Sequence, residues 1–141
     1  MRTTRAFEIT IRVPWADTDA AAIVWLGNFV KYVEQAEEEL FRTCGYPRLD
    51  LMRESILFPR TTLHCSFRSP ARFDDVLTIA LGIEKMSERR IGYWFEITQV
   101  ESKTLVVEGT YEVACVDAVT FKSREIPEYV RAAFTARMRG N

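Results

Sequence analysis

Residues 7–45 have the sequence FEITIRVPWADTDAAAIVWLGNFVKYVEQAEEELFRTCG. At its start, apolar and polar residues alternate from Phe7 to Val13, and this period of two predicts a half-buried strand that Pro14 stops. A turn of small residues and two aspartates follows. The segment then changes to the spacing of a helix, so a strand leads through a short turn directly into a helix.

The expected helix is long and amphipathic. Apolar side chains recur at helical spacing from Phe29 to Leu40, while the opposite face is charged. Asn28 is the expected N-cap and Gly45 the expected C-terminal stop. A helix of roughly seventeen residues would be about 25 Å long at 1.5 Å per residue.

The rest of the chain is predicted to be mostly strand. Apolar residues alternate at 63–67, 77–83, 91–97 and 105–115, and the turns between the last three sets indicate an antiparallel meander. The segment 46–59 is expected to be irregular or weakly helical, and Pro127 is expected to open a short C-terminal helix.

These elements predict one α+β domain over residues 1–141, in which an antiparallel five-stranded sheet wraps around one long central helix. The long helix is the only large cover available for the apolar face of the sheet. Pairing with a second subunit would protect the open sheet edges most simply.

The composition excludes several classes of protein. Nineteen basic and twenty acidic residues give a net charge of −1, which argues against a nucleic-acid binder. No apolar run approaches the ~20 residues that span a bilayer, and the N-terminus has no secretory signal, so we expect a cytoplasmic protein. Three widely spaced cysteines have no zinc-ligand spacing, and Asp17 and Asp19 lack further acidic ligands nearby, so no metal site is expected.

The two aspartates of the turn are the leading candidates for chemistry. A carboxylate just before a helix lies beside backbone N–H groups that have no partner and can stabilise an anion. A base or nucleophile next to such a site is the minimum equipment for acyl transfer. Hydrolysis of an activated acyl group is therefore the leading hypothesis.

A family resemblance strengthens this hypothesis. The segments Trp15-Ala-Asp-Thr-Asp19 and Ile23-Val-Trp-Leu-Gly-Asn-Phe29, with the later Ser69-Pro-Ala-Arg-Phe-Asp-Asp-Val-Leu-Thr-Ile79, resemble the motifs of the 4-hydroxybenzoyl-CoA thioesterase family. The resemblance extends from about Phe7 to Tyr129. It implies the hotdog fold and hydrolysis of acyl-CoA thioesters by homodimers or dimers of dimers, with active sites between subunits. Coenzyme A is then part of the substrate, and no cofactor is implied.

The resemblance also implies roles for single residues. Asp19 falls on the catalytic carboxylate, which acts as a nucleophile on the thioester or as a general base on water. The backbone N–H near Leu26 falls on the oxyanion contact, and Glu34 on a helix position that contacts the acyl group. Arg89 and Arg90 lie at a turn where the family contacts the CoA nucleotide.

The remaining candidates are weaker. Trp25 and Phe58 are candidate substrate contacts, although such aromatics more often belong to a core or an interface. Asp17 is interpreted as a structural residue that caps the turn or pairs with Arg12. Three positions depart from the family pattern. Ala22 replaces a common glycine, Leu26 replaces a polar side chain and favours apolar acyl groups, and Glu34 is longer than the usual aspartate.

Two other kinds of function remain as alternatives. A non-catalytic acyl-CoA-binding module could have the same fold. A hydrolytic triad or a hotdog dehydratase would need the only histidine, His64, but the motifs of those enzymes are missing around it.

Overall fold

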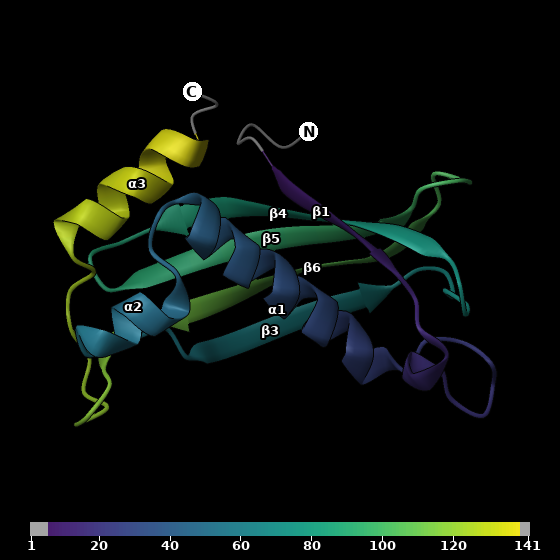
Figure 1. Cartoon of the computed structure of the whole chain (residues 1–141), viewed down its shortest axis with the longest axis horizontal. Coiled ribbons are helices and arrows are strands. Elements are labelled where there is room, and N and C mark those ends of the chain that lie inside the picture. The colour runs from purple at the N-terminus through teal and green to yellow at the C-terminus, as the bar shows by residue number, and fades with distance from the viewer. Residues whose placement is uncertain (1–5, 139–141) are drawn as a thin grey trace.

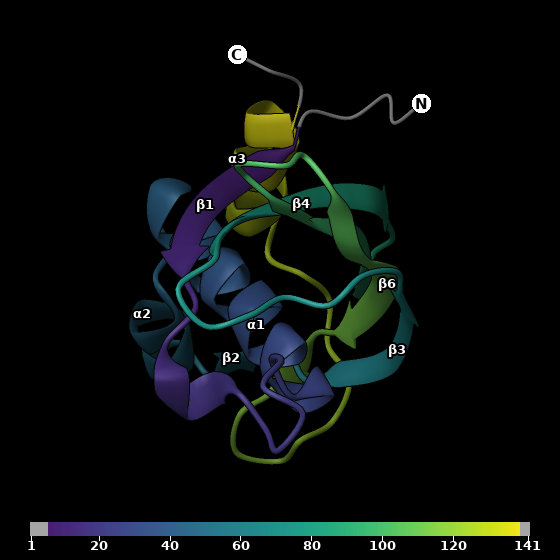
Figure 2. The same ribbon diagram turned by 90° about the vertical axis from the view of Figure 1, so that its right-hand side faces the viewer.

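The computed structural model describes residues 6–138. A five-stranded antiparallel sheet curves around one long helix (Figures 1 and 2). The main elements are β1 (Phe7–Arg12), α1 (Leu26–Thr43), β3 (Arg60–Phe67), β4 (Val76–Met86), β5 (Arg90–Gln99), β6 (Leu105–Ala114) and α3 (Glu128–Met138). The strand order is β1-β4-β5-β6-β3, so the predicted meander β4-β5-β6 is confirmed and β1 and β3 form the edges.

The core lies between α1 and the concave face of the sheet. Leu77, Ile79 and Leu81 alternate along β4 and are fully buried, as the period-two pattern predicted. From α1, Ala36 and Leu40 are fully buried against them. The predicted α+β arrangement of a sheet around one central helix is therefore confirmed.

The ends of α1 differ in how well the sequence predicted them. Gly45 has φ +89°, a backbone conformation that glycine adopts easily, so the predicted C-terminal stop is confirmed. The predicted N-cap was wrong, because the helix begins at Leu26 and Trp25 is its N-cap residue. The Asn28 side chain instead donates a hydrogen bond to the carbonyl oxygen of Asp17, at 2.9 Å.

Smaller elements lie near the C-terminal end of α1 (Figure 1). They are α2 (Arg48–Arg53), β2 (Ile56–Leu57) and β7 (Val116–Asp117), with β2 and β7 paired antiparallel. The weak helix expected within 46–59 is α2, whereas no alternation signalled the two-residue strands. The expected helix after Pro127 is α3, and its Phe134 packs on Phe41 of α1 with ring centroids 5.0 Å apart.

Edge strand β3 departs from the simple alternation prediction. Leu63 and Phe67 belong to the alternating apolar set 63–67, but their side chains are 47% and 52% exposed. A strand at the edge of a sheet has one unpaired side, and here part of its apolar face is also uncovered. No helix within residues 6–138 is both long and apolar enough to cross a membrane.

Candidate active site

The candidate site is built from the loop between β1 and α1. After Pro14 the chain forms a short 3-10 helix, η1 (Trp15–Asp17), and then a tight turn that returns to the start of α1. Thr18 and Val24 form a β-bridge, and the amide of Asp19 donates to the carbonyl oxygen of Ile23 at 2.9 Å. Ala22 closes the turn with φ +64°, at the position where the family pattern has glycine.

The turn presents the Asp19 carboxylate to solvent. One oxygen, Oδ1, accepts a hydrogen bond from the Ala21 amide at 2.9 Å, which fixes the orientation of the side chain. The second oxygen makes no hydrogen bond within the part of the chain that the structure describes. An exposed carboxylate with one free oxygen is available to attack a carbonyl carbon or to accept a proton from water.

The first turn of α1 supplies backbone donors beside it. The amide of Asn28 donates to the carbonyl oxygen of Trp25 at 2.9 Å. Those of Leu26 and Gly27 have no acceptor among the hydrogen bonds of residues 6–138, as expected for the first N–H groups of a helix. The positive end of the helix dipole lies at the same place, so the field also favours an anion there.

Asp19 and the helix start open into one pocket. Its volume is about 610 Å³. Its wall consists of Asp19, Ile23, Val24, Trp25, Leu26, Phe29, Phe67, Arg68, Ser69 and Pro70. Most of these side chains are apolar, and the Phe29 and Phe67 rings pack together with centroids 6.1 Å apart. The structure therefore brings together Asp19, Leu26 and Trp25, three of the residues singled out from the sequence.

Sequence reasoning missed the part of this wall that the end of β3 and the residues just after it contribute. Phe67 was predicted only as a residue of an alternating strand and Arg68 had no assigned role, yet both line the pocket. The sequence feature that could have pointed to this part of the wall is the second motif, which begins at Ser69. In the fold, the carbonyl oxygen of its Ala71 accepts a hydrogen bond from the Val24 amide at 2.8 Å. The two sequence motifs are therefore hydrogen-bonded neighbours in the fold.

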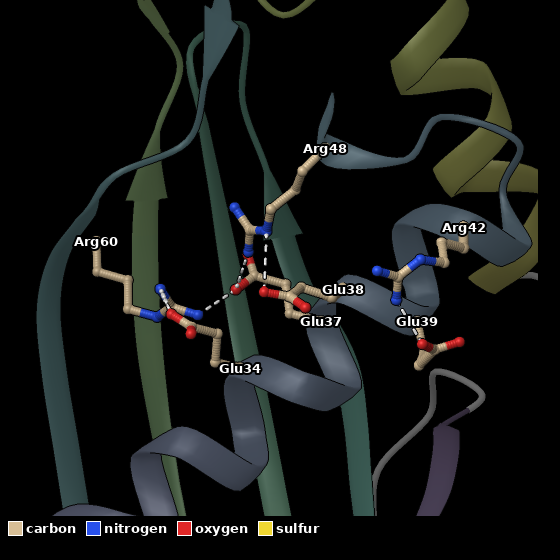
Figure 3. A network of polar contacts seen from close by, with 7 residues as sticks. All are labelled: Glu34, Glu37, Glu38, Glu39, Arg42, Arg48 and Arg60. Atoms are coloured by element: carbon tan, nitrogen blue, oxygen red, sulfur yellow. Dashed lines mark hydrogen bonds and ion pairs between the residues drawn. The ribbon is translucent and has the colours of Figure 1, made fainter. Parts of the chain in front are cut away.

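Glu34 lies elsewhere, in a network of charged residues along α1. It pairs with Nη1 of Arg60 at 3.2 Å, and the same guanidinium contacts the buried Glu37 (Figure 3). Burial raises the pKa of Glu37, opposed by the charges of Arg48 and Arg60. Glu34 does not belong to the pocket wall, and its carboxylate is already paired with Arg60.

Phe58 also lies apart from Asp19. It is 4% exposed and packs on Phe41 with ring centroids 5.7 Å apart. The reason is its position just before β3 begins, whereas the pocket lies where β3 ends at Phe67. Within this chain Phe58 is a core residue, as such aromatics commonly are.

Arg89 and Arg90 lie at the turn between β4 and β5. Arg89 donates to the Ser123 hydroxyl at 3.1 Å, and Arg90 pairs with Glu112 at 3.1 Å. Arg90 also lines a second pocket of about 200 Å³, together with Lys85 and Ser87. This cationic turn is not part of the pocket that contains Asp19.

Asp17 was interpreted as a structural residue that caps the turn or pairs with Arg12, and the second of these alternatives was wrong. Arg12 pairs with Asp74 at 3.3 Å, while Asp17 contacts Lys31 and Tyr32 of α1. Lys31 follows Asp17 by fourteen residues, and only the folded loop brings it near.

Within residues 6–138, no group of three or more His, Cys, Asp or Glu side chains is placed to hold a metal ion.

Comparison with known proteins decides the family. Residues 13–134, most of the chain, match the thioesterase-like superfamily. This chain belongs to the thioesterase-like superfamily. Together with the relatives described next, this match confirms the family recognised from the sequence motifs, the hotdog fold and the enzyme class, a thioesterase.

Individual relatives agree with this assignment. The chain is 31% identical to the acyl-CoA thioester hydrolase YbgC of Escherichia coli over 131 residues, which cover 93% of this chain and 97% of YbgC. It is 32% identical over 84 residues to a 4-hydroxybenzoyl-CoA thioesterase of a Pseudomonas species, covering 57% and 60% of the two chains. The solved structure of a 1,4-dihydroxy-2-naphthoyl-CoA thioesterase from Synechocystis superposes with a TM-score of 0.86 at 23% identity, over 93% and 96% of the two chains.

Proposed function

We propose that this member of the thioesterase-like superfamily hydrolyses acyl-CoA thioesters, with Asp19 as the catalytic carboxylate. The observation that carries the proposal is the meeting of Asp19 and the first amides of α1 in one pocket. Asp19 attacks the thioester carbonyl or activates water, and the amides near Leu26 stabilise the negative charge that develops on the carbonyl oxygen. The match to YbgC along nearly its whole length supports an acyl-CoA substrate.

The pocket wall supports an apolar acyl group. Trp25 and Leu26 are 54% and 57% exposed beside the helix start, and Phe67 faces them from β3. Covering these side chains with an acyl group would gain about 25 cal/mol for each Å² of apolar surface removed from water. The acyl group is therefore an aromatic ring or a short to medium chain without a polar end group.

The position of the arginines supports an active site shared between subunits. Arg90 begins β5, and the opposite end of this strand, at Gln99, pairs with Leu77 near the loop that carries Asp19. At about 3.3 Å per residue, β5 separates the two ends by roughly 30 Å. If Arg89 and Arg90 hold the CoA nucleotide, they hold the CoA that is bound to a partner subunit. The uncovered edge strand β3 further supports a homodimer or a dimer of dimers.

A thiol-release assay tests the proposal. Purified protein is incubated with short, medium and long-chain aliphatic acyl-CoAs and with aromatic acyl-CoAs, and free CoA is measured. We expect release with apolar acyl groups and at least about a hundredfold lower turnover for Asp19→Asn, the lower range for acid–base catalysis.

Two outcomes would contradict the proposal. Tight binding of acyl-CoAs without any release would indicate the non-catalytic module instead. Nearly wild-type turnover of a folded Asp19→Asn variant would remove Asp19 from the mechanism.

A further inference from the structure

The two aspartates of the turn lie in opposite environments. Asp19 is exposed at the pocket, whereas Asp17 is 7% exposed and is not part of the pocket wall. Its carboxylate accepts hydrogen bonds from Lys31 Nζ at 2.8 Å and from the Tyr32 hydroxyl at 2.6 Å. A buried carboxylate is tolerated when it is paired and hydrogen-bonded, and Asp17 is both.

The backbone of Asp17 makes a second pair of contacts to the same region. Its carbonyl oxygen accepts from the amide of Trp25 at 3.0 Å and from Asn28 Nδ2 at 2.9 Å. All four donors therefore belong to residues 25–32, the N-cap and the first two turns of α1. These hydrogen bonds therefore hold together the two ends of the turn that carries Asp19.

Asp17 and Tyr32 each keep a single protonation state near neutral pH. Burial opposes ionisation of Asp17, but the hydrogen bonds from Lys31 and Tyr32 outweigh it and lower the pKa of the carboxyl group. Burial and the hydrogen bond to Asp17 raise the pKa of Tyr32. The carboxylate therefore stays ionised and the phenol neutral, and the hydrogen bonds keep a single direction.

We propose that Asp17 is a positioning residue, which holds the Asp19 carboxylate in register with the first amides of α1. The role rests on the proposed function, because it acts through Asp19. The catalytic carboxylate and the oxyanion donors come from different elements, a turn and a helix, and a misplacement of about 1 Å between such groups can lower turnover 10²-fold. Asp17 is the residue that joins these two elements by side chain and backbone together.

The test is a double-mutant cycle of turnover between positions 17 and 19. Asp17→Asn keeps the side-chain shape and removes the charge, and we expect kcat to fall about tenfold to a hundredfold with KM little changed. In the Asp19→Asn background the same substitution is expected to change the residual kcat by less than about twofold, because no carboxylate remains to be positioned.

A second variant and a control keep the result interpretable. Tyr32→Phe retains the buried ring and removes one hydrogen bond to Asp17, so we expect a smaller loss of kcat in the same direction. Asp117→Asn is the control, since Asp117 also organises a turn, by accepting from the amides of Val119 and Thr120 at 2.9 Å. It should lower the melting temperature and leave kcat unchanged.

The outcomes separate the two proposals. An inactive Asp19→Asn with wild-type kcat in folded Asp17→Asn and Tyr32→Phe would overturn the positioning role and leave the proposed function in place. An equal loss from Asp17→Asn in both backgrounds would also overturn it, because the effect would then not pass through Asp19. A fully active Asp19→Asn would overturn the proposed function itself.

Discussion

Oε1 of Glu37, midway along α1, lies 3.0 Å from Nη2 of Arg48 on α2, and the glutamate side chain is completely buried. Arg60 of β3 contacts the same carboxylate from the other side (Figure 3). A single acid therefore links the central helix to α2 and to the edge strand. The charges compensate one another only as a set, because each would be costly to bury alone.

Glu37→Ala is expected to destabilise the protein by about 3–5 kcal/mol, since it leaves two arginines partly buried without their carboxylate. Urea unfolding followed by circular dichroism gives the free energy of unfolding. The matched control is Glu39→Ala, which breaks an exposed pair with Arg42 on the same helix. That variant should lie within about 1 kcal/mol of wild type. Equal effects of the two substitutions would show that burial of the Glu37 pair contributes nothing.

Ala22→Gly is expected to stabilise the protein. Ala22 has φ +64°, a conformation that costs an L-residue roughly 1–2 kcal/mol and glycine almost nothing. The greater freedom of glycine in the unfolded chain offsets part of this gain, so the free energy of unfolding should rise by up to about 1 kcal/mol.

The neighbouring Ala21 provides the control for this substitution, because it lies outside the left-handed region. Ala21→Gly should lower the free energy of unfolding by about 0.4–1 kcal/mol. Thermal melts of the two single variants compare them directly. A destabilising Ala22→Gly would mean that the turn is not strained at this position.

The fold was predictable because its signals are periodic. Alternation over Leu77–Leu81 and helical spacing over Phe29–Leu40 each specify which face is buried, and a sheet with one apolar face needs the long helix as its cover. Edge strand β3 broke the rule, since the alternating Leu63 and Phe67 remain uncovered within this chain. Periodicity identifies a strand but not whether its partner is in the same chain.

The site was predictable only in part. Asp19 and Leu26 share a local motif, so the sequence places them near one another. The partners of Asp17 depend instead on how the loop folds back onto α1, and no local pattern distinguishes Lys31 from Arg12 as its ion pair. Phe67 lies in the pocket wall because it packs on Phe29. These two residues are far apart in the sequence, so no local pattern predicts this contact.

Phe67→Ala is expected to weaken the use of apolar acyl-CoAs. The ring forms one wall of the pocket, and losing part of its burial against an acyl group should cost about 1–2 kcal/mol, or roughly tenfold in kcat/KM. Phe73→Ala is the control, because Phe73 is similarly exposed at 50%, packs on Trp15 and is not part of the wall. The comparison is made across the aliphatic series. Equal kcat/KM values for Phe67→Ala and wild type at every chain length would remove Phe67 from the acyl site.

Mixed dimers of two inactive variants test whether active sites are shared between subunits. Asp19→Asn lacks the proposed catalytic carboxylate, and the double variant Arg89→Ala/Arg90→Ala lacks the proposed CoA contacts at the far end of β5. If each site takes Asp19 from one subunit and the arginines from the other, a mixed dimer contains one intact site and one doubly impaired site. Assayed below the KM, co-expressed variants should regain about a quarter of wild-type turnover, because half of randomly assorted dimers are mixed.

Sites contained within one subunit predict a different result for the same mixture. Every site in a mixed dimer would then carry one of the two defects, and the turnover of the mixture would equal the average of the two separate variants. Differently tagged subunits allow the mixed dimer to be purified and assayed alone. If the turnover of the purified mixed dimer is no higher than the average of the two separate variants, active sites are not shared between subunits.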